Sequence, residues 1–423
     1  MKTWSKLVIS GVLFSAVLAQ GLVSVAAQER KRTPALREQV YSQLARAQEA
    51  ADNGQVQDGL AILRAVEDKA DSMNSYERAM LWNFYGYLYY EQDDMSNAIQ
   101  YFGKVVDESP IPESLEQNTL YSLAQLSLGQ GNYDQVLSYL ERWQALVGDE
   151  QANKADVLRA QALYQQGNFK AALAPIKRAI ERAEAEGEFG DENWYVLIRA
   201  IYYELEQPEQ VANVLETMVR AFNKPEYWLQ LAGVYGQLER DKLQLAMLET
   251  AYQQGFLTEG RDLQNLAQAY FFNDVPFKAG QVMERGIAEG RIEANLRNLK
   301  MLAQSWVAAN ESDKAAAVLA KASALEESGE LDAQRAQILL NTEQNEAAIA
   351  AAEQALAKGG LESPGTMHLV IGMAKLNLLQ FNDALQAFAE AKKFEDARTM
   401  ARQWERYAES EKQQAEVLAE LRS

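Results

Sequence analysis

Hydrophobic and polar residues alternate along most of the chain with the period of an α-helix, in pairs of segments separated by short polar turns. Residues 79–112 show the pattern most clearly. Trp82, Tyr85 and Tyr89 recur at i, i+3 and i+7, so their bulk lies on one face of a first helix. Phe102 follows on a second helix, where its ring fills the space that the two helices enclose. This stretch predicts a helical hairpin.

Small residues mark the places where the two helices of a hairpin approach each other. Gly86 lies on the first helix of this stretch and Ala98 lies twelve residues later on the second. Pro110 ends the second helix, because proline lacks the N–H that a continuing helix needs. The small residues of successive first helices recur with a period of about 34 residues, and they are Ala47, Gly86, Ala124, Ala160, Ala200, Ala232, Ala267, Ala303, Ala336 and Gly372.

The fixed spacing of twelve residues predicts about ten hairpins in an all-α solenoid over residues 28–398. Residues 399–423 are expected to form a capping helix with a polar outer side. Residues 242–251 are expected to need an insertion to stay in phase, and Pro34 is expected at the first position of the first helix. The expected repeats cover residues 40–73, 79–112, 117–150, 153–186, 193–225, 225–258, 260–293, 296–329, 329–362 and 365–398.

The turns between paired helices are rich in glycine and asparagine. A Gly-Asn pair ends two such turns that lie 36 residues apart, Gly129-Gln130-Gly131-Asn132 and Gln165-Gln166-Gly167-Asn168. These residue types supply the positive φ angles that a tight reversal between helices needs. Both segments therefore predict short turns inside hairpins.

The signature positions of residues 79–112 resemble those of the tetratricopeptide repeat, a helix-turn-helix unit of 34 residues. The resemblance implies a right-handed superhelical solenoid, because a single repeat buries only one face and neighbours must stack on it. It also implies that positions two, five, nine and twelve of each first helix face a concave groove. The positions that carry the resemblance hold Trp82, Tyr85, Gly86, Tyr89, Ala98, Phe102 and Pro110.

Groove positions in three early repeats carry tyrosines and amides, which suit a peptide ligand. The rings offer apolar area at low entropy cost, and the amides can bind an extended backbone. The alternative is that some of these rings pack between adjacent repeats. The candidate protein-binding residues are Asn83, Tyr87, Tyr90, Asn118, Tyr121, Gln125, Lys154, Gln161 and Tyr164.

Some chaperone-binding relatives hold a C-terminal carboxylate with cationic residues and asparagine on the first three repeats. None of the corresponding positions in this chain is cationic, so a chaperone C-terminus is not an expected ligand. These positions hold Leu44, Gln48, Phe84, Asn118 and Ser122.

The net charge of −19 argues against a nucleic-acid partner. Phosphate binding needs a basic stripe, and the longest run of cationic residues is Arg30-Lys31-Arg32. The acidity indicates a well-solvated surface, or alternatively attraction to a basic partner segment.

The N-terminus has the pattern of a secretory signal peptide over residues 1–27. Lys2 and Lys6 precede an apolar segment, and small residues end it before Gln28. The alternative is an uncleaved anchor in the inner membrane, since residues 7–27 carry no charge. The chain has no cysteine, so it has neither a thiol to acylate nor a disulfide. We expect a periplasmic protein with no membrane span after cleavage.

The sequence offers little catalytic chemistry. His368 is the single histidine, and it occupies a packing position in the last repeat. One histidine without cysteine cannot furnish a structural zinc site or a Cys-His dyad. The chain is therefore expected to be no enzyme and to hold neither cofactor nor metal.

Three stretches resemble periplasmic tetratricopeptide proteins that accompany TonB-ExbB-ExbD energy-transduction clusters. They are residues 81–86, 110–117 and 224–233. The resemblance implies a protein-interaction scaffold that is accessory to TonB-dependent transport, with a TonB, ExbB or ExbD component as partner. The alternative is a scaffold for envelope biogenesis, serving pili, polysaccharide export or outer-membrane assembly.

Overall fold

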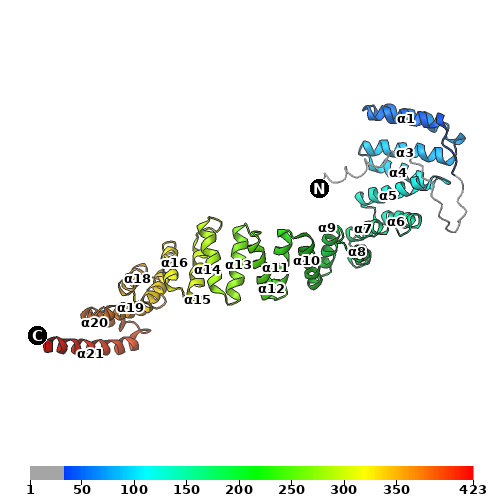
Figure 1. The fold of residues 1–423 in the computed structure, drawn as a ribbon. Helices are drawn as coiled ribbons and strands as arrows, with labels where there is room; N and C mark the ends of the chain where they lie inside the picture. The colour runs from blue at the N-terminus through cyan, green and yellow to red at the C-terminus, as the bar shows by residue number, and fades with distance from the viewer. Residues whose placement is uncertain (1–32, 150, 423) are drawn as a thin grey trace. The chain divides into compact units, whose positions relative to one another are not determined.

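The computed structural model describes residues 33–149 and 151–422, with side chains up to Leu418. Within these residues every regular element is a helix, as predicted for an all-α repeat fold (Figure 1). The chain divides into two compact units, Met1–Ala179 and Ile180–Ser423. No helix in the described residues is long and apolar enough to cross a membrane. The signal peptide expected at residues 1–27 lies outside the described residues.

The first unit consists of helices joined in pairs by short turns. Each second helix up to α6 packs on the first helix of the next pair, and α1 also packs on α3. A 3-10 turn, Ala70–Ser72, precedes α3, and the boundary of the unit falls within α8. The helices are α1 (Glu38–Asp52), α2 (Val56–Glu67), α3 (Ser75–Glu91), α4 (Met95–Asp107), α5 (Glu113–Gly129), α6 (Tyr133–Val147), α7 (Ala152–Gln165) and α8 (Phe169–Ala185).

The second unit continues the same arrangement of paired helices and ends with a single long helix. The helices are α9 (Glu192–Glu204), α10 (Pro208–Phe222), α11 (Pro225–Gln237), α12 (Asp241–Gln253), α13 (Gly260–Phe272), α14 (Pro276–Ala288), α15 (Leu296–Ala308), α16 (Ser312–Ser323), α17 (Glu330–Asn341), α18 (Asn345–Lys358), α19 (Pro364–Asn377), α20 (Phe381–Ala391) and α21 (Arg398–Arg422).

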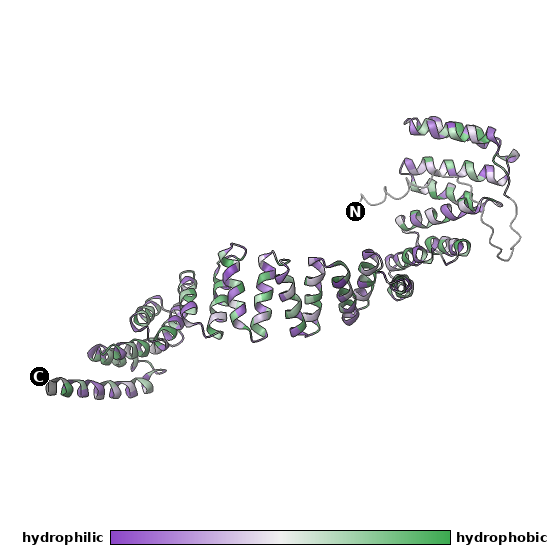
Figure 2. Cartoon of the chain, viewed as in Figure 1, coloured by the Kyte–Doolittle hydropathy of each residue, from purple (hydrophilic) through white to green (hydrophobic). Residues whose placement is uncertain are grey.

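The hydrophobic stripe of each helix faces its neighbours, and small residues let paired helices approach. Figure 2 shows green and purple residues interspersed along the ribbons of the helices, as in amphipathic helices. Ala98, Ala279 and Ala384, which are second-helix residues of the twelve-residue spacing, are completely buried. A Cβ on Gly86 would lie 2.7 Å from the ring of Phe102, so this position needs glycine. The missing side chain at Gly86 therefore lets the ring of Phe102 pack directly on α3.

One residue with positive φ reverses the chain in most of the turns between paired helices. Gly131 and Gly167 take φ of +75° and +80°, as their sequence context predicts. Other hairpins place a non-glycine residue at the equivalent position, including Asp93, Asn310 and Leu379. The geometry of the turn is thus conserved along the array while its glycine is not.

The structure corrects two expectations about helix phase. Helix α1 begins at Glu38 and Pro34 precedes it, because the backbone N–H of Arg37 donates to the Glu77 carboxylate (3.1 Å) and holds the chain extended. The 225–258 hairpin needs no insertion. Its second helix keeps the usual phase because Gln244 takes the small-residue position and lies against Gly236, where the missing Cβ leaves room for a long side chain.

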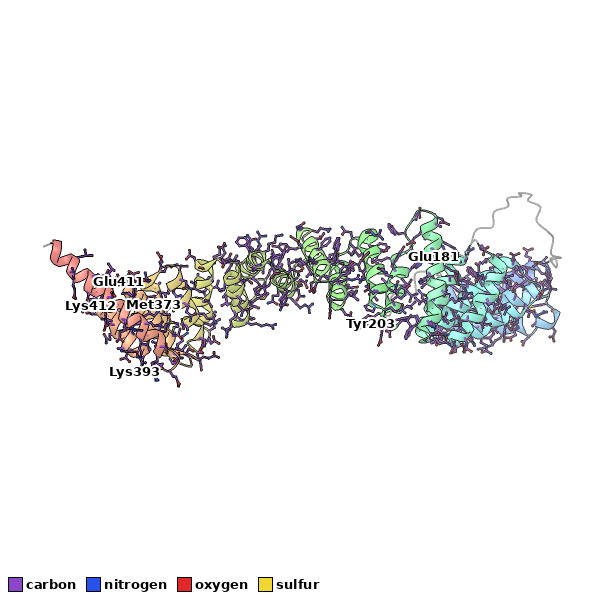
Figure 3. The ribbon with its side chains drawn as sticks, turned by 90° about the horizontal axis from the view of Figure 1, so that it is seen from below. Glu181, Tyr203, Met373, Lys393, Glu411 and Lys412 are labelled. Carbon is purple, nitrogen blue, oxygen red and sulfur yellow. The ribbon has the colours of Figure 1, made fainter. Side chains whose placement is uncertain are left out.

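Among the side chains of α21 that the structure describes, those of its first half pack on the last hairpin. Ala401 and Ala408 are fully buried, and Trp404 stacks on Phe388 with ring centroids 6.4 Å apart. Glu411 and Lys412 lie on the part that extends past this contact (Figure 3). The first half of the helix therefore covers the apolar end of the last hairpin.

Candidate functional site

The nine candidate residues of the early repeats lie on first helices, as their positions in the repeat require. Asn83, Tyr87 and Tyr90 are on α3, and the other six are on α5 and α7. Asn118 and Lys154 are exposed, whereas the remaining seven are half-buried. The structure thus spreads these residues over three consecutive first helices.

Several of the tyrosine rings pack against protein. The Tyr121 ring lies 5.0 Å from that of buried Trp143 on α6, and burial raises the pKa of Tyr121. The Tyr164 ring lies 5.4 Å from that of Phe169 on α8. Burial also raises the pKa of Tyr87, with the charge of Glu91 as the next cause. The Tyr121 and Tyr164 rings each pack within their own hairpin, whereas the sequence pattern suggested rings that are exposed to a ligand.

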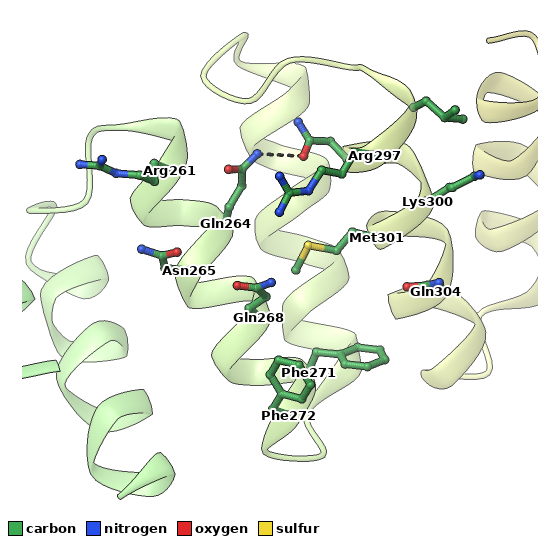
Figure 4. A pocket seen from close by; sticks show the side chains of 12 residues that line it. Arg261, Gln264, Asn265, Gln268, Phe271, Phe272, Arg297, Lys300, Met301 and Gln304 are labelled. Carbon is green, nitrogen blue, oxygen red and sulfur yellow. Dashed lines mark hydrogen bonds between the residues drawn. The ribbon is translucent and has the colours of Figure 1, made fainter. Parts of the chain in front are cut away.

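An open groove lies elsewhere, between α13 and α15 in the second unit (Figure 4). It is open to solvent and has a volume of about 810 Å³. Both helices are the first helices of their hairpins. The lining residues are Arg261, Gln264, Asn265, Gln268, Phe271, Phe272, Leu296, Arg297, Asn298, Lys300, Met301 and Gln304.

This groove uses the positions that the repeat pattern assigns to a concave face. In the repeat that begins at residue 260, positions two, five, nine and twelve hold Arg261, Gln264, Gln268 and Phe271, and all four line the groove. The next repeat contributes three more residues by the same rule. The repeat pattern in the sequence therefore predicts this groove when the rule for the early repeats is extended to residues 260–304.

Asn298 and Gln264 join the two helices across the floor of the groove. Asn295 caps α15, where its side chain accepts from the backbone N–H of Asn298 (3.0 Å). The Asn298 side chain is buried, donates to the Glu293 carbonyl (2.8 Å) and accepts from Gln264 on α13 (2.9 Å). The dashed line in Figure 4 marks this last bond. A buried amide with both ends satisfied fixes the spacing of α13 and α15.

The charged residues that line the groove are all cationic. Arg261 and Arg297 are exposed, and neither forms an ion pair with the residues that the structure describes. Lys300 donates to Glu326 (2.7 Å), so part of its charge is neutralised. Asp262 lies beside Arg261 outside the lining, and burial raises its pKa although the Arg261 charge acts in the opposite direction. The groove therefore offers two guanidinium groups to a ligand.

The opposite end of the groove is apolar. Phe271 and Phe272 end helix α13, and their rings lie 6.1 Å apart edge to face. Phe272 is 76% exposed, which is unusual for so large an apolar side chain. Met301 extends from α15 towards α13, between the arginine end and the phenylalanine end of the groove (Figure 4). This end can receive an apolar side chain.

A second, smaller depression lies between α12 and α14, on the side of the second helices. Two of the charged residues that line it are paired with each other, because Lys278 donates to Glu249 (2.6 Å). His368 stacks on Phe394 with ring centroids 5.5 Å apart, in agreement with the expected packing role. Within the described residues, no cluster of three or more histidine, aspartate or glutamate residues could hold a metal.

Residues 44–110 and 121–187 match the profile of the tetratricopeptide repeat family. These two segments are similar to tetratricopeptide repeats. They make up about a third of the chain, and the other helical pairs have the same arrangement of two helices and a short turn. No functionally curated protein matches the sequence.

Solved structures of tetratricopeptide proteins are similar to the chain at low identity. The TPR2AB domain of yeast Sti1, solved as a complex with pHSP90, is 13% identical over 61% of this chain and 98% of its own (TM-score 0.35). A repeat protein from Parabacteroides merdae is 14% identical over 61% and 99% (TM-score 0.31). YrrB, described as having an unusual peptide-binding site, is 14% identical over 45% and 97% (TM-score 0.34). At this level the similarity concerns the fold alone.

Proposed function

We propose that the chain is a non-enzymatic scaffold that binds an extended segment of a partner protein in the groove between α13 and α15. One observation carries the proposal: two successive first helices direct exposed polar, cationic and aromatic side chains into one open groove of about 810 Å³. Tetratricopeptide repeats mediate interactions between proteins, and their first helices supply the binding surface. The groove has the chemistry that such an interaction needs.

The lining of the groove suits a peptide better than a small metabolite. Gln268, Asn265 and Gln304 are exposed amides that can donate to and accept from a peptide backbone. Phe271 and Phe272 add apolar area at one end. A small-molecule site is normally a more enclosed and more apolar cavity. An open groove with a mixed lining matches an extended chain.

The cellular setting that we propose is the periplasm, in a role accessory to TonB-dependent transport. The supports are the N-terminal sequence pattern and the resemblance of residues 81–86, 110–117 and 224–233 to TonB-associated proteins. The proposed partners are accordingly a TonB, ExbB or ExbD component. A scaffold for envelope biogenesis is the competing assignment.

Selection of peptides on the protein tests the groove. A phage library of random twelve-residue peptides is panned on the mature chain, and the enriched peptides are then tested on two variants. Gln268→Trp fills the groove and is expected to lower binding by at least about tenfold, since a bulky ring excludes the ligand. Gln281→Trp, on α14 outside the groove, is the matched control. Equal binding to both variants, or no enrichment, contradicts the proposal.

Direct binding measurements test the proposed TonB-system partners. The mature chain is titrated against the purified periplasmic domains of TonB and ExbD from the same cell, with biolayer interferometry as the readout. A dissociation constant in the micromolar range supports the TonB assignment. Absence of binding at 1 mM of either domain, corresponding to less than about 4 kcal/mol of affinity, favours the envelope-biogenesis alternative.

A further inference from the structure

We propose that the α13–α15 groove selects an acidic segment that also carries an apolar side chain, with the acidic residues at the Arg261 and Arg297 end. This inference rests on the proposed function, because it requires the groove to bind a protein segment at all. It adds the charge of the partner, the spacing of its key residues and its orientation.

The lining of the groove is positively charged, whereas the chain as a whole is negatively charged. Asp and Glu number 60 in the sequence against 41 Lys and Arg. Among the twelve lining residues, Arg261, Arg297 and Lys300 are cationic and none is acidic. A surface patch with the overall composition of this chain would hold more carboxylates than cationic groups. The groove is therefore a local cationic site on an acidic protein, which is what recognition of a carboxylate requires.

The acidic residues near the groove leave its two arginines available. Glu326 is engaged with Lys300, and the Glu293 carboxylate accepts from Asn295 (3.0 Å). Asp262 is partly buried next to Arg261, lies outside the lining and forms no ion pair with Arg261. Arg261 and Arg297 both present planar guanidinium groups, which bind carboxylates through two parallel hydrogen bonds.

The order of side chains along the helices gives the groove a direction. Arg261 and Arg297 are each the second residue of their helix, while Phe271 and Phe272 are the last residues of α13. Figure 4 shows the arginines and the phenylalanines at opposite ends of the groove. Residues 261 and 272 are about 16 Å apart along the axis of α13. An extended peptide covers this distance with about five residues.

The partner is therefore expected to have carboxylates and an aromatic or aliphatic side chain about five positions apart. The carboxylates belong to side chains within the segment, so a free C-terminus is not needed. A basic segment of the kind that suits the overall acidity of the chain would meet like charge here. Such a segment would bind another surface of the protein.

Anisotropy measurements with defined peptides test the inference on the mature chain. The probe is a fluorescein-labelled peptide with both termini blocked, carrying two glutamates, four serine or glycine residues, and then phenylalanine and leucine. Its matched forms replace the glutamates with glutamine or with lysine. We expect the glutamine form to bind about tenfold more weakly and the lysine form more weakly still. Moving the glutamates next to the phenylalanine is expected to reduce binding as well.

Variants of the protein test whether the preference for the glutamate peptide arises in the groove. Arg261→Gln combined with Arg297→Gln is expected to weaken the glutamate peptide about tenfold and to leave the glutamine peptide unchanged, because only the charge interaction is removed. Phe272→Ala is expected to weaken both peptides equally. Arg220→Gln on α10 combined with Arg285→Gln on α14, both outside the groove, removes the same two charges and is the matched control.

Two results would overturn the acidic preference and leave the proposed function standing. One is equal or tighter binding of the glutamine or lysine peptide to the wild-type groove. The other is no binding of the glutamate peptide while groove-dependent library peptides do bind. A library selection that yields no groove-dependent peptide removes the proposed function itself, and the inference falls with it.

Discussion

Single residues in the turns between helices hold part of the strain of the array. Leu379 takes φ of +60° and is 72% exposed, so its side chain gains little from burial. A left-handed conformation costs an ordinary L-residue about 1–2 kcal/mol. Gly167 fills the equivalent position in an earlier hairpin without this cost.

We expect Leu379→Gly to raise the free energy of unfolding by about 0.5–1 kcal/mol, after the entropy that glycine loses on folding is subtracted. Gly167→Ala, at a site with open space for a Cβ, is expected to lower it by about 1 kcal/mol. Midpoints of urea unfolding measure both. A decrease in stability for Leu379→Gly would contradict this account of the turn.

Gly372 illustrates how a close approach makes glycine necessary. A Cβ at this position would lie 2.3 Å from the ring of Phe388, which is fully buried and cannot move away easily. We expect Gly372→Ala to destabilise the protein by about 1–3 kcal/mol. Gly233 on α11 has no atom near its Cβ position, so Gly233→Ala should instead stabilise by about 0.5–1 kcal/mol. Thermal unfolding of the two variants separates sterics from helix propensity.

At the scale of elements, one buried carboxylate ties the start of α1 to the start of α3. Glu77 accepts from the backbone N–H of Asn74 (3.1 Å) in a capping box and from the Arg37 side chain (2.6 Å). The hydrogen bond from Arg37 is the main cause that lowers the pKa of Glu77 to about 2. Its charged form is therefore stabilised in the folded state.

This pKa gives a dependence of stability on pH. The folded pKa of Glu77 is depressed, so its contribution is complete above about pH 4.5 and is lost as the pH falls towards 2. Because Arg37 is 55% exposed, solvent screens the pair, and we expect Glu77→Gln to cost about 1–2 kcal/mol at pH 7. The difference from wild type should shrink between pH 4.5 and 2. Urea unfolding at several pH values measures it, with exposed Glu353→Gln as the control. A constant difference across this range would argue against the assignment.

The repeat register could be predicted from the sequence because the contacts that create it are local. Ala98 and Ala384 follow their partners by twelve residues, and both are buried as expected. The candidate residues were harder to judge. Tyr121 occupies a groove position, yet its ring packs on Trp143. Helical periodicity predicts the helix face from which a side chain projects. Whether the side chain then stays exposed or packs on a neighbour depends on the residues around it.

On the scale of the whole molecule, successive hairpins within each unit pack on one another, and each unit has its own contacts. Stability in such an array is approximately a sum of repeat and interface terms. A defect in one unit should therefore remain local.

We expect Gly86→Ala, which drives a Cβ into the ring of Phe102, to speed amide exchange in α1–α6 and to leave α13–α16 unchanged. Hydrogen exchange followed by mass spectrometry measures both regions in one experiment. Gly103→Ala on α4, where a Cβ meets open space, is the matched control. Faster exchange throughout both units would show that the array unfolds as one cooperative body.

The sequence by itself determined the helical pairs, their turns and the positions that face a groove. These depend on spacings of a few residues within one hairpin, and such spacings are visible in a linear chain. Only the tertiary structure decided that the open groove lies between α13 and α15, that Lys300 is paired with Glu326 and that Arg261 and Arg297 are not ion-paired. These features depend on how side chains from different hairpins meet. The sequence pattern of a repeat is the same whether neighbouring side chains fill its groove positions or leave them open.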